Sequence, residues 1–172
     1  MNDVSLLEMM NAREMRCRLQ QQLLHLYRES LICLTLNIPG PVKVLPGVPN
    51  AFETACRRID ALLKEHQISA EHTDIVKEKT GYEAFYSISA PAEPVKELMI
   101  SLEDQDRLGR LLDIDVLRPD GTKVSREDLG YPARRCLLCN EPAHACSRSR
   151  RHSVEELVTE IQKILKDYTP EG

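Results

Sequence analysis

The sequence predicts an α+β fold in which helices flank a mixed or mainly antiparallel sheet. Segments with helical periodicity alternate with short apolar runs, and two of those runs are joined by a tight turn at residues 80–81. A length of 172 residues is enough for one complete hydrophobic core, and no long polar or Gly/Ser-rich linker divides the chain. We therefore expect one domain over residues 1–172.

The N-terminal residues are expected to form a long helix followed by a buried strand. Ser5 with Glu8 fits a capping box, which starts a helix over residues 5–29. Residues 31–36 form a nearly continuous apolar run that is too short for a helix and has the length of a buried strand. The apolar face predicted for the helix contains Leu6, Met10, Cys17, Leu24 and Tyr27.

The middle of the chain is expected to contain a second helix and a hairpin. Asn50 with Glu53 starts the helix, which runs to about residue 66. Two strands over residues 73–79 and 82–89 then flank the turn. The apolar stripe of this helix consists of Phe52, Ala55, Cys56, Ile59, Leu62 and Leu63.

Two more helices, one strand and a short return strand are expected in the C-terminal half. Residues 95–102 have helical spacing, and Gly109 marks the end of that helix. A strand containing Asp113 and Asp115 follows, and the turn at residues 118–121 leads into a short return strand through Val124. Ser153 caps a last helix that extends to about residue 168.

Asp113 and Asp115 are the first candidate functional residues. In a strand they share one face, while Leu112, Ile114 and Val116 point into the core. Two adjacent carboxylates repel each other unless a cation neutralises them, and Mg²⁺ is held by one or two carboxylates together with substrate phosphates. A solvated strand face that carries two acids is the alternative interpretation.

A second candidate is a group of cysteine and histidine residues near the C-terminus. Cys136 and Cys139 form a C-x-x-C pair, and Cys146 with His152 or His144 would complete four ligands for tetrahedral Zn²⁺. A standard zinc ribbon has a second C-x-x-C pair, which this chain lacks. Reduced cysteines packed beneath a basic loop are therefore the alternative.

Arginines are concentrated in the same segment. Arginine side chains bind phosphate oxygens bidentately, so this concentration favours a polyanionic substrate over a merely solvated surface. Lys43, on the proline-stiffened loop after the first strand, could reach a phosphate or simply add solubility. The arginines in question are Arg134, Arg135, Arg148, Arg150 and Arg151.

Composition excludes several classes of protein. A net charge of −4 argues against general nucleic-acid binding, which needs a basic surface. No apolar run approaches the ~20 residues of a membrane helix. The first residues lack the features of a signal peptide, so we expect a cytoplasmic protein whose six cysteines are reduced.

Three motifs in this order resemble the apo-citrate lyase phosphoribosyl-dephospho-CoA transferases, also called holo-citrate lyase acyl carrier protein synthases (the CitX family). They are P-G-P-V-K at 39–43, G-R-L-L-D-I-D-V at 109–116, and R-R-C-L-L-C at 134–139 with R-S-R-R-H at 148–152. The D-I-D-V strand is also similar to the metal-binding strand of polymerase-β-type nucleotidyltransferases. However, the Gly-Ser turn that usually precedes that strand is absent here.

The resemblance implies that the chain attaches the citrate lyase prosthetic group to a serine of the apo acyl carrier subunit. The donor would be 2'-(5''-triphosphoribosyl)-3'-dephospho-CoA, with pyrophosphate as leaving group. Asp113 and Asp115 would then be catalytic Mg²⁺ ligands, and Asp115 could accept the serine proton. The expected phosphate contacts are Lys43, Arg110, Arg134 and Arg135, and the candidates for a third carboxylate are Glu83, Glu103 and Asp104.

A non-enzymatic interpretation also has to be considered. Residues 132–152 could form an arginine-rich or zinc-stapled loop that docks on an acidic carrier protein. The aspartate pair distinguishes the two interpretations, because phosphoryl chemistry needs neighbouring carboxylates and a docking loop does not.

Overall fold

The computed structural model describes residues 2–171. Its four strands form one antiparallel sheet in the order β2-β3-β1-β4, so the predicted α+β class is confirmed and the sheet contains no parallel pair. The elements are α1 (Leu6–Tyr27), β1 (Ser30–Leu36), α2 (Val48–Glu65), β2 (Ala70–Glu78), β3 (Gly81–Ile88), α3 (Ala92–Asp104), α4 (Arg107–Leu111), β4 (Leu112–Leu117), α5 (Ala143–Ser149) and α6 (Val154–Leu165), with short 3-10 helices at Glu127–Leu129 and Lys166–Tyr168.

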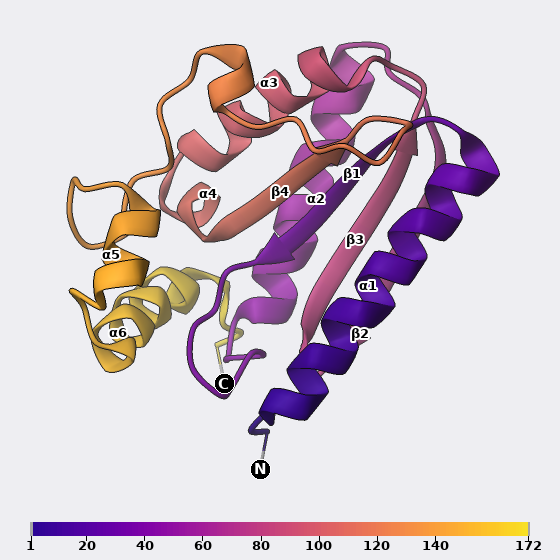
Figure 1. Ribbon diagram of the computed structural model, residues 1–172. Helices are drawn as coiled ribbons and strands as arrows, with labels where there is room; N and C mark the ends of the chain where they lie inside the picture. Colours follow the sequence, from indigo (N-terminus) through magenta and orange to yellow (C-terminus); the bar gives the residue numbers. More distant parts are fainter. Residues whose placement is uncertain (1, 172) are drawn as a thin grey trace.

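The main core lies between the sheet and helices α2 and α3, which are seen behind the sheet in Figure 1. Alternate residues of the strands point into it, such as Ile32 of β1, Tyr86 of β3 and Ile114 of β4. Their complete burial explains why residues 31–36 are almost continuously apolar: the opposite face of β1 is also covered, by α1.

Helix α1 covers only part of the second face. It packs on β1 and β3 through a small cluster that includes Leu23, Leu31 and Phe85, whereas most of β4 lies beyond β1, away from the helix (Figure 1). The capping box of Ser5 and Glu8 is present as predicted. The second face of the sheet is therefore left open along β4.

The apolar face predicted for α1 is only partly correct. Leu6, Met10 and Cys17 are exposed, whereas Leu24 and Tyr27 are half-buried against the cluster that contains Leu23. Helix periodicity shows that apolar residues share a side, but it does not show which neighbour covers that side. Ahead of Leu23, the side of the helix that faces the sheet also carries Arg16 and Gln20, which form polar contacts with β3 and β1.

The start of α2 also differs from the prediction. The helix begins at Val48 after Gly47, whose left-handed φ of 92° ends the preceding loop. Asn50 therefore lies inside the first turn, and its amide donates to the carbonyl of Tyr168 at 2.8 Å instead of capping α2. The other strong cap holds as predicted, because the Ser153 hydroxyl accepts from Glu156 N–H at the start of α6.

Two predicted features around β4 change in the structure. Gly109 does not end α3 but lies inside α4, where a Cβ would come within 2.2 Å of the Leu102 carbonyl oxygen. The turn at residues 118–121 is present, with Gly121 at a φ of 89°. The expected return strand is reduced to one bridge between Leu117 and Lys123.

No helix among residues 2–171 is both long enough and apolar enough to cross a membrane.

Candidate active site and cysteine cluster

Asp113 and Asp115 lie on the open face of the edge strand β4. As predicted, they share one side, while Leu112, Ile114 and Val116 are fully buried on the other. Half of the Asp113 side chain and a third of the Asp115 side chain remain accessible. In the register with β1, Asp113 pairs with Thr35 and Asp115 with Cys33. The carboxylates are therefore held by a regular ladder and can still be reached from solvent.

Two charged side chains of α3 form hydrogen bonds with the backbone at the free edge of β4. The Lys96 ammonium donates to the Ile114 carbonyl at 2.8 Å, and the Ile114 N–H donates to a Glu103 carboxylate oxygen at 3.0 Å. Both side chains are almost fully buried, and this burial lowers the pKa of Lys96. Because Ile114 lies between the two aspartates, this pair of bonds fixes the backbone that carries them.

Glu103 also joins two arginines to this edge. Its carboxylate accepts from Arg126 at 2.9 Å and lies 3.5 Å from Arg134. Arg126 is nine-tenths buried and contacts Asp104 as well. A buried carboxylate with these partners is satisfied only while every member of the network remains in place.

We predict that Glu103→Gln destabilises the protein by about 2–4 kcal/mol, because the change removes the charge that compensates buried Arg126. Urea unfolding followed by circular dichroism measures the effect. Glu97→Gln is the matched control, since Glu97 lies on the same helix and is exposed. Equal unfolding free energies for the two variants would contradict the assigned role of Glu103.

Cationic side chains surround the aspartate pair. The Lys123 ammonium lies 3.2 Å from Asp115, and an Arg134 nitrogen lies 3.8 Å from Asp113. These cations offset the repulsion between the two carboxylates while no metal is bound.

Three of the predicted phosphate-binding arginines line one small cavity of about 190 Å³ beside the aspartate pair. Arg110 and Arg134 also tie the cavity wall together, because Arg110 donates to the Cys136 carbonyl at 2.6 Å and Arg134 donates to the Arg110 carbonyl at 2.9 Å. Arg135 is exposed. The charged residues of the lining are Arg110, Arg126, Arg134, Arg135, Glu103 and Asp104.

Arg126 is the member of this cavity that the sequence did not indicate. It is the residue that directly precedes the short 3-10 helix Glu127–Leu129. No motif or spacing distinguishes it from a surface arginine. Only the packing of that turn against α3 places its guanidinium in the cavity.

Lys43 lies apart from this cavity. Its ammonium donates to the Ile38 carbonyl at 2.8 Å on the loop that follows β1. Partial burial, together with neighbouring Arg13 of α1, lowers the pKa of Lys43. Because Leu36 at the end of β1 pairs with Leu112, this loop leaves the sheet beside the start of β4. The structure thus places Lys43 near the Asp113 end of the strand, on the side of α1.

Of the three candidate third carboxylates, Glu83 alone lies on the same face of the sheet as the aspartates, although α1 covers it there. It pairs with Thr35, which pairs with Asp113 on its other side, and it forms an ion pair with Arg16. Glu103 and Asp104 instead bind Arg126. Two strand spacings separate Glu83 from Asp113, about 10 Å between Cα atoms. Mg²⁺ binding by the two aspartates stays a prediction, and substrate oxygens would have to complete its coordination.

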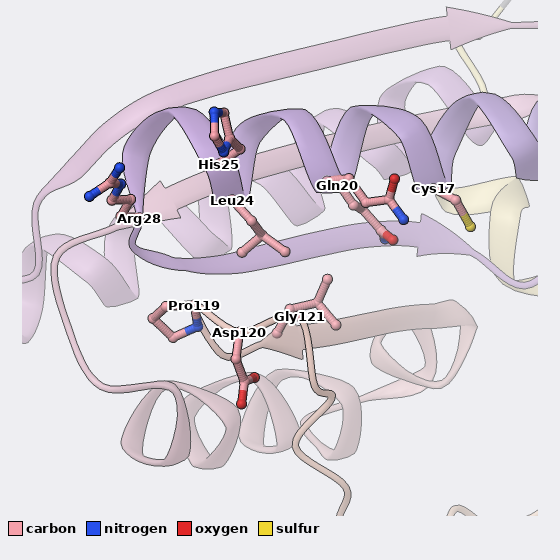
Figure 2. A pocket seen from close by; sticks show the side chains of 10 residues that line it. Cys17, Gln20, Leu24, His25, Arg28, Pro119, Asp120 and Gly121 are labelled. Carbon is pink, nitrogen blue, oxygen red and sulfur yellow. The ribbon is translucent and has the colours of Figure 1, made fainter.

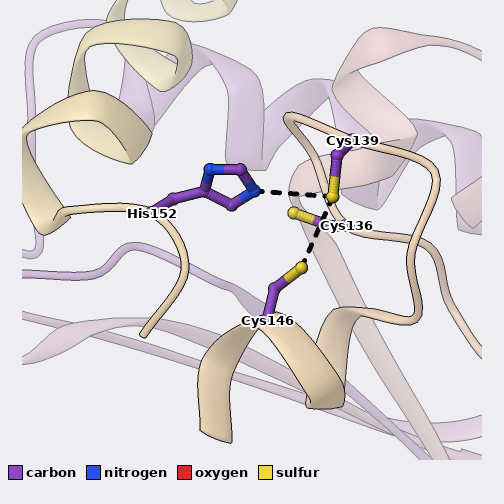
Figure 3. A group of neighbouring side chains, drawn as sticks. All are labelled: Cys136, Cys139, Cys146 and His152. Carbon is purple, nitrogen blue, oxygen red and sulfur yellow. Dashed lines mark hydrogen bonds between the residues drawn. The ribbon is translucent and has the colours of Figure 1, made fainter. Parts of the chain in front are cut away.

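The four residues predicted as zinc ligands lie together, as Figure 3 shows. Their ligand atoms are all within 4.8 Å of one another, and the Cys139 sulfur lies 3.4 Å from both Cys146 Sγ and His152 Nε2. Within residues 2–171, this is the one group of three or more such ligands close enough to share an ion. His144, the alternative ligand, is exposed and not part of it.

Local structure explains how these ligands converge. Cys136 and Cys139 come from a loop, Cys146 from α5, and His152 from the residue before the α6 cap. Burial raises the pKa of the Cys136 thiol, but hydrogen bonds from the backbone N–H groups of Leu138 and Cys139 and from the thiols of Cys139 and Cys146 together lower that pKa overall. Tetrahedral Zn²⁺ with sulfur ligands at 2.3 Å separates them by about 3.8 Å, which this group can accommodate. The Cys₃His group can therefore hold a metal ion such as zinc.

The arginines that follow the cluster are on the surface. Arg148 lies in the last turn of α5, and Arg150 ends that helix in a left-handed conformation with a φ of 52°. Arg148, Arg150 and Arg151 are all exposed. They face solvent and do not line the cavity next to the aspartate pair.

Comparison with known proteins covers nearly the whole chain. A Vibrio cholerae serotype O1 protein named "Probable apo-citrate lyase phosphoribosyl-dephospho-CoA transferase" is 38% identical over 167 residues, 96% of this chain and 94% of the relative. A Streptococcus pyogenes protein with the same name is 39% identical over 171 residues, 96% of this chain and 87% of the relative. The Haemophilus influenzae "Protein CitXG" is 37% identical over 96% of this chain, which corresponds to 36% of that longer protein.

The match to a family profile has the same extent. It covers residues 4–168, from the residue before the Ser5 cap to the last turn at Tyr168, and includes the aspartate pair, the arginine cavity and the cysteine cluster. The chain belongs to the CitX family, the apo-citrate lyase phosphoribosyl-dephospho-CoA transferases.

Proposed function

We propose that the chain transfers the prosthetic group of citrate lyase from 2'-(5''-triphosphoribosyl)-3'-dephospho-CoA to a serine of the apo acyl carrier subunit. Family membership gives the reaction. The accessible pair Asp113 and Asp115 is the observation that indicates where on the chain the reaction takes place. Lys123, Arg134 and the arginine cavity border this pair. Carboxylates and cations side by side are what a metal-assisted transfer from a triphosphate requires.

The reaction exchanges a phosphoanhydride bond of the donor for a phosphate ester bond to the carrier. The serine oxygen of the carrier bonds to the α-phosphorus, the bond from that phosphorus to the bridging oxygen breaks, and pyrophosphate leaves with the electron pair. The serine proton goes to a base, and Asp115 is the candidate on this chain. The product is a phosphodiester that joins the carrier serine to the 5'' oxygen of the ribosyl-dephospho-CoA group.

Each group at the site has a role in this scheme. Asp113 and Asp115 would hold Mg²⁺, which when bound neutralises phosphate charge and lowers the pKa of the attacking hydroxyl. Arg134 and Arg135 would bind the phosphates through charge-assisted hydrogen bonds, with Arg110 also holding the cavity wall. Lys43 would contact the phosphates from the side of α1. The Cys₃His cluster would bind structural zinc rather than substrate.

The test mixes the protein with apo carrier, Mg²⁺ and the triphosphoribosyl donor, and follows the carrier's intact mass and pyrophosphate release. We expect equimolar mass gain and pyrophosphate, with neither product when the attachment serine of the carrier is replaced by alanine. A carrier that binds the protein but never gains mass would overturn the transferase proposal. That result would favour an adaptor that docks through exposed arginines such as Arg148 and Arg151.

A further inference from the structure

A second hollow lies between α1 and the end of β4. Its volume is about 570 Å³, within the range of ligand pockets in proteins. One wall is the C-terminal half of α1, from Cys17 to Arg28, and the other is Leu117 with the turn at residues 119–121 (Figure 2). The site described above uses none of these residues. We call this hollow the α1 groove.

The α1 groove is continuous with the face that carries the aspartates. Arg16 forms an ion pair with Glu83, which lies in the row of Asp113, and the Gln20 amide donates to the sulfur of Cys33, the partner of Asp115. Helix α1 thus runs alongside β4 in the same direction. Leu117, in the groove wall, follows Asp115 on the same strand face by one two-residue step, or about 7 Å. The groove therefore begins where the carboxylate pair ends.

The groove also gives two apolar residues of α1 a common surface, because exposed Cys17 and half-buried Leu24 both line it. Met10, Cys17 and Leu24 recur every seven residues, and the last two line the groove. In Figure 2, Leu24 points from α1 toward the turn. An apolar stripe beside an open hollow gives a ligand a surface on which to bury carbon atoms.

Polar groups accompany this stripe. Gln21 offers an exposed amide, and Arg28 lies at the end of α1, where a guanidinium can bind phosphate. The carboxylate of Asp120 is occupied, since it accepts from the N–H and the hydroxyl of Thr122. The amide of Gln21 and the guanidinium of Arg28 thus suit a ligand that has both a ring with hydrogen-bonding atoms and anionic oxygens.

The two ends of the aspartate strand differ in charge. Beyond Asp113 lie Lys43 and Arg13, close enough for each to affect the other electrostatically. Beyond Asp115 and its partner Lys123 lies the α1 groove, whose lining combines amides and apolar side chains with Arg28 at its far end. A ligand laid along the strand would therefore place its most anionic part near Asp113 and its nucleotide part near Leu117.

We propose that the α1 groove binds the dephospho-CoA portion of the donor, with the α-phosphorus at the aspartates and the departing pyrophosphate toward Lys43. The orientation rests on the proposed transferase function. The groove then holds the part of the donor that remains attached to the carrier, while the basic end holds the part that leaves. Binding energy from the nucleotide would position the α-phosphorus without any new contact at the reacting atoms.

The test uses dephospho-CoA itself as the probe, titrated into the protein by calorimetry. Gln21→Trp places a bulky ring in the groove, and Gln22→Trp makes the same change on the neighbouring exposed glutamine, which does not line it. We expect Gln21→Trp to weaken dephospho-CoA binding about tenfold or more and Gln22→Trp to leave it within about twofold. The KM for the complete donor should rise in Gln21→Trp alone, while inhibition by pyrophosphate stays unchanged.

The outcomes separate this proposal from the transferase proposal. No binding of dephospho-CoA to the parent protein, or equal binding by the two tryptophan variants, would overturn the groove assignment even if the carrier is loaded normally. Selective weakening in Gln21→Trp supports the groove as a dephospho-CoA site. That support would stand even if the carrier-loading assay failed, whereas the orientation toward the aspartates would then be withdrawn.

Discussion

Asp113→Asn and Asp115→Asn are each expected to reduce carrier loading by about a thousandfold while the protein stays folded. Each change removes one negative charge with little change in side-chain volume, so metal binding suffers and β4 does not. Lys123 and Arg134 each lose a partner, but these contacts are partly exposed and contribute within about 1 kcal/mol. The measurement is the initial rate of pyrophosphate release with saturating carrier and donor.

Asp167→Asn is the matched control for this pair. Asp167 is an exposed aspartate in the C-terminal 3-10 helix, outside the site, and its amide variant should turn over at the parent rate. Thermal unfolding of all three variants checks that the fold is intact. Near-parent activity in either Asp113→Asn or Asp115→Asn would show that this carboxylate is not part of the metal site.

The protein purified without chelator is expected to contain close to one zinc per chain. His152→Ala should lose most of this zinc, because it removes one of four ligands and leaves an incomplete site. We expect the loss to destabilise the protein by at least about 2 kcal/mol, or roughly 4–8 °C in Tm for a chain of this size. Elemental analysis and calorimetric unfolding measure the two effects.

His144→Ala supplies the control for the zinc prediction. His144 lies in the same segment but is exposed and outside the cluster, so its replacement should change neither zinc content nor Tm. Zinc below about a tenth of an equivalent in the parent protein would instead favour cysteines that are simply packed together.

The cysteine cluster and the aspartate pair are physically connected. The Cys136 carbonyl accepts from Arg110, two residues before β4 begins, and Arg134 lies between the Arg110 carbonyl and Asp113. Loss of metal would loosen the loop that carries Arg134 and Arg135 into the arginine cavity. The zinc-free protein is therefore expected to lose turnover as well as stability.

Features that depend on neighbours in sequence were predictable. The period of two in β4 put Asp113 and Asp115 on one face, and the caps at Ser5 and Ser153 are set by a side chain and a backbone N–H three residues away. The C-x-x-C spacing likewise brought Cys136 and Cys139 together. In each case the partners are too close along the chain for tertiary structure to separate them.

Features that depend on which surfaces meet were not predictable. Nothing local shows that α1 turns Leu6, Met10 and Cys17 away from the sheet, that Asn50 binds Tyr168 rather than capping α2, or that Arg126 reaches Glu103. Which histidine joins the three cysteines, His144 or His152, also depends on the path of the chain between α5 and α6. These outcomes are decided by long-range packing, in which one surface excludes another.

By itself, the sequence determined the α+β class, the acid pair and the candidate ligands, because hydrophobic period, turn chemistry and capping act over a few residues. It also carried the family motifs. Only the tertiary structure decided that β4 is an edge strand closed by Lys96 and Glu103, and that α1 leaves the face of Asp113 and Asp115 open. The physical reason is that strand order and helix placement depend on how the whole hydrophobic core is buried. The site lies on the part of the sheet that this packing leaves accessible to solvent.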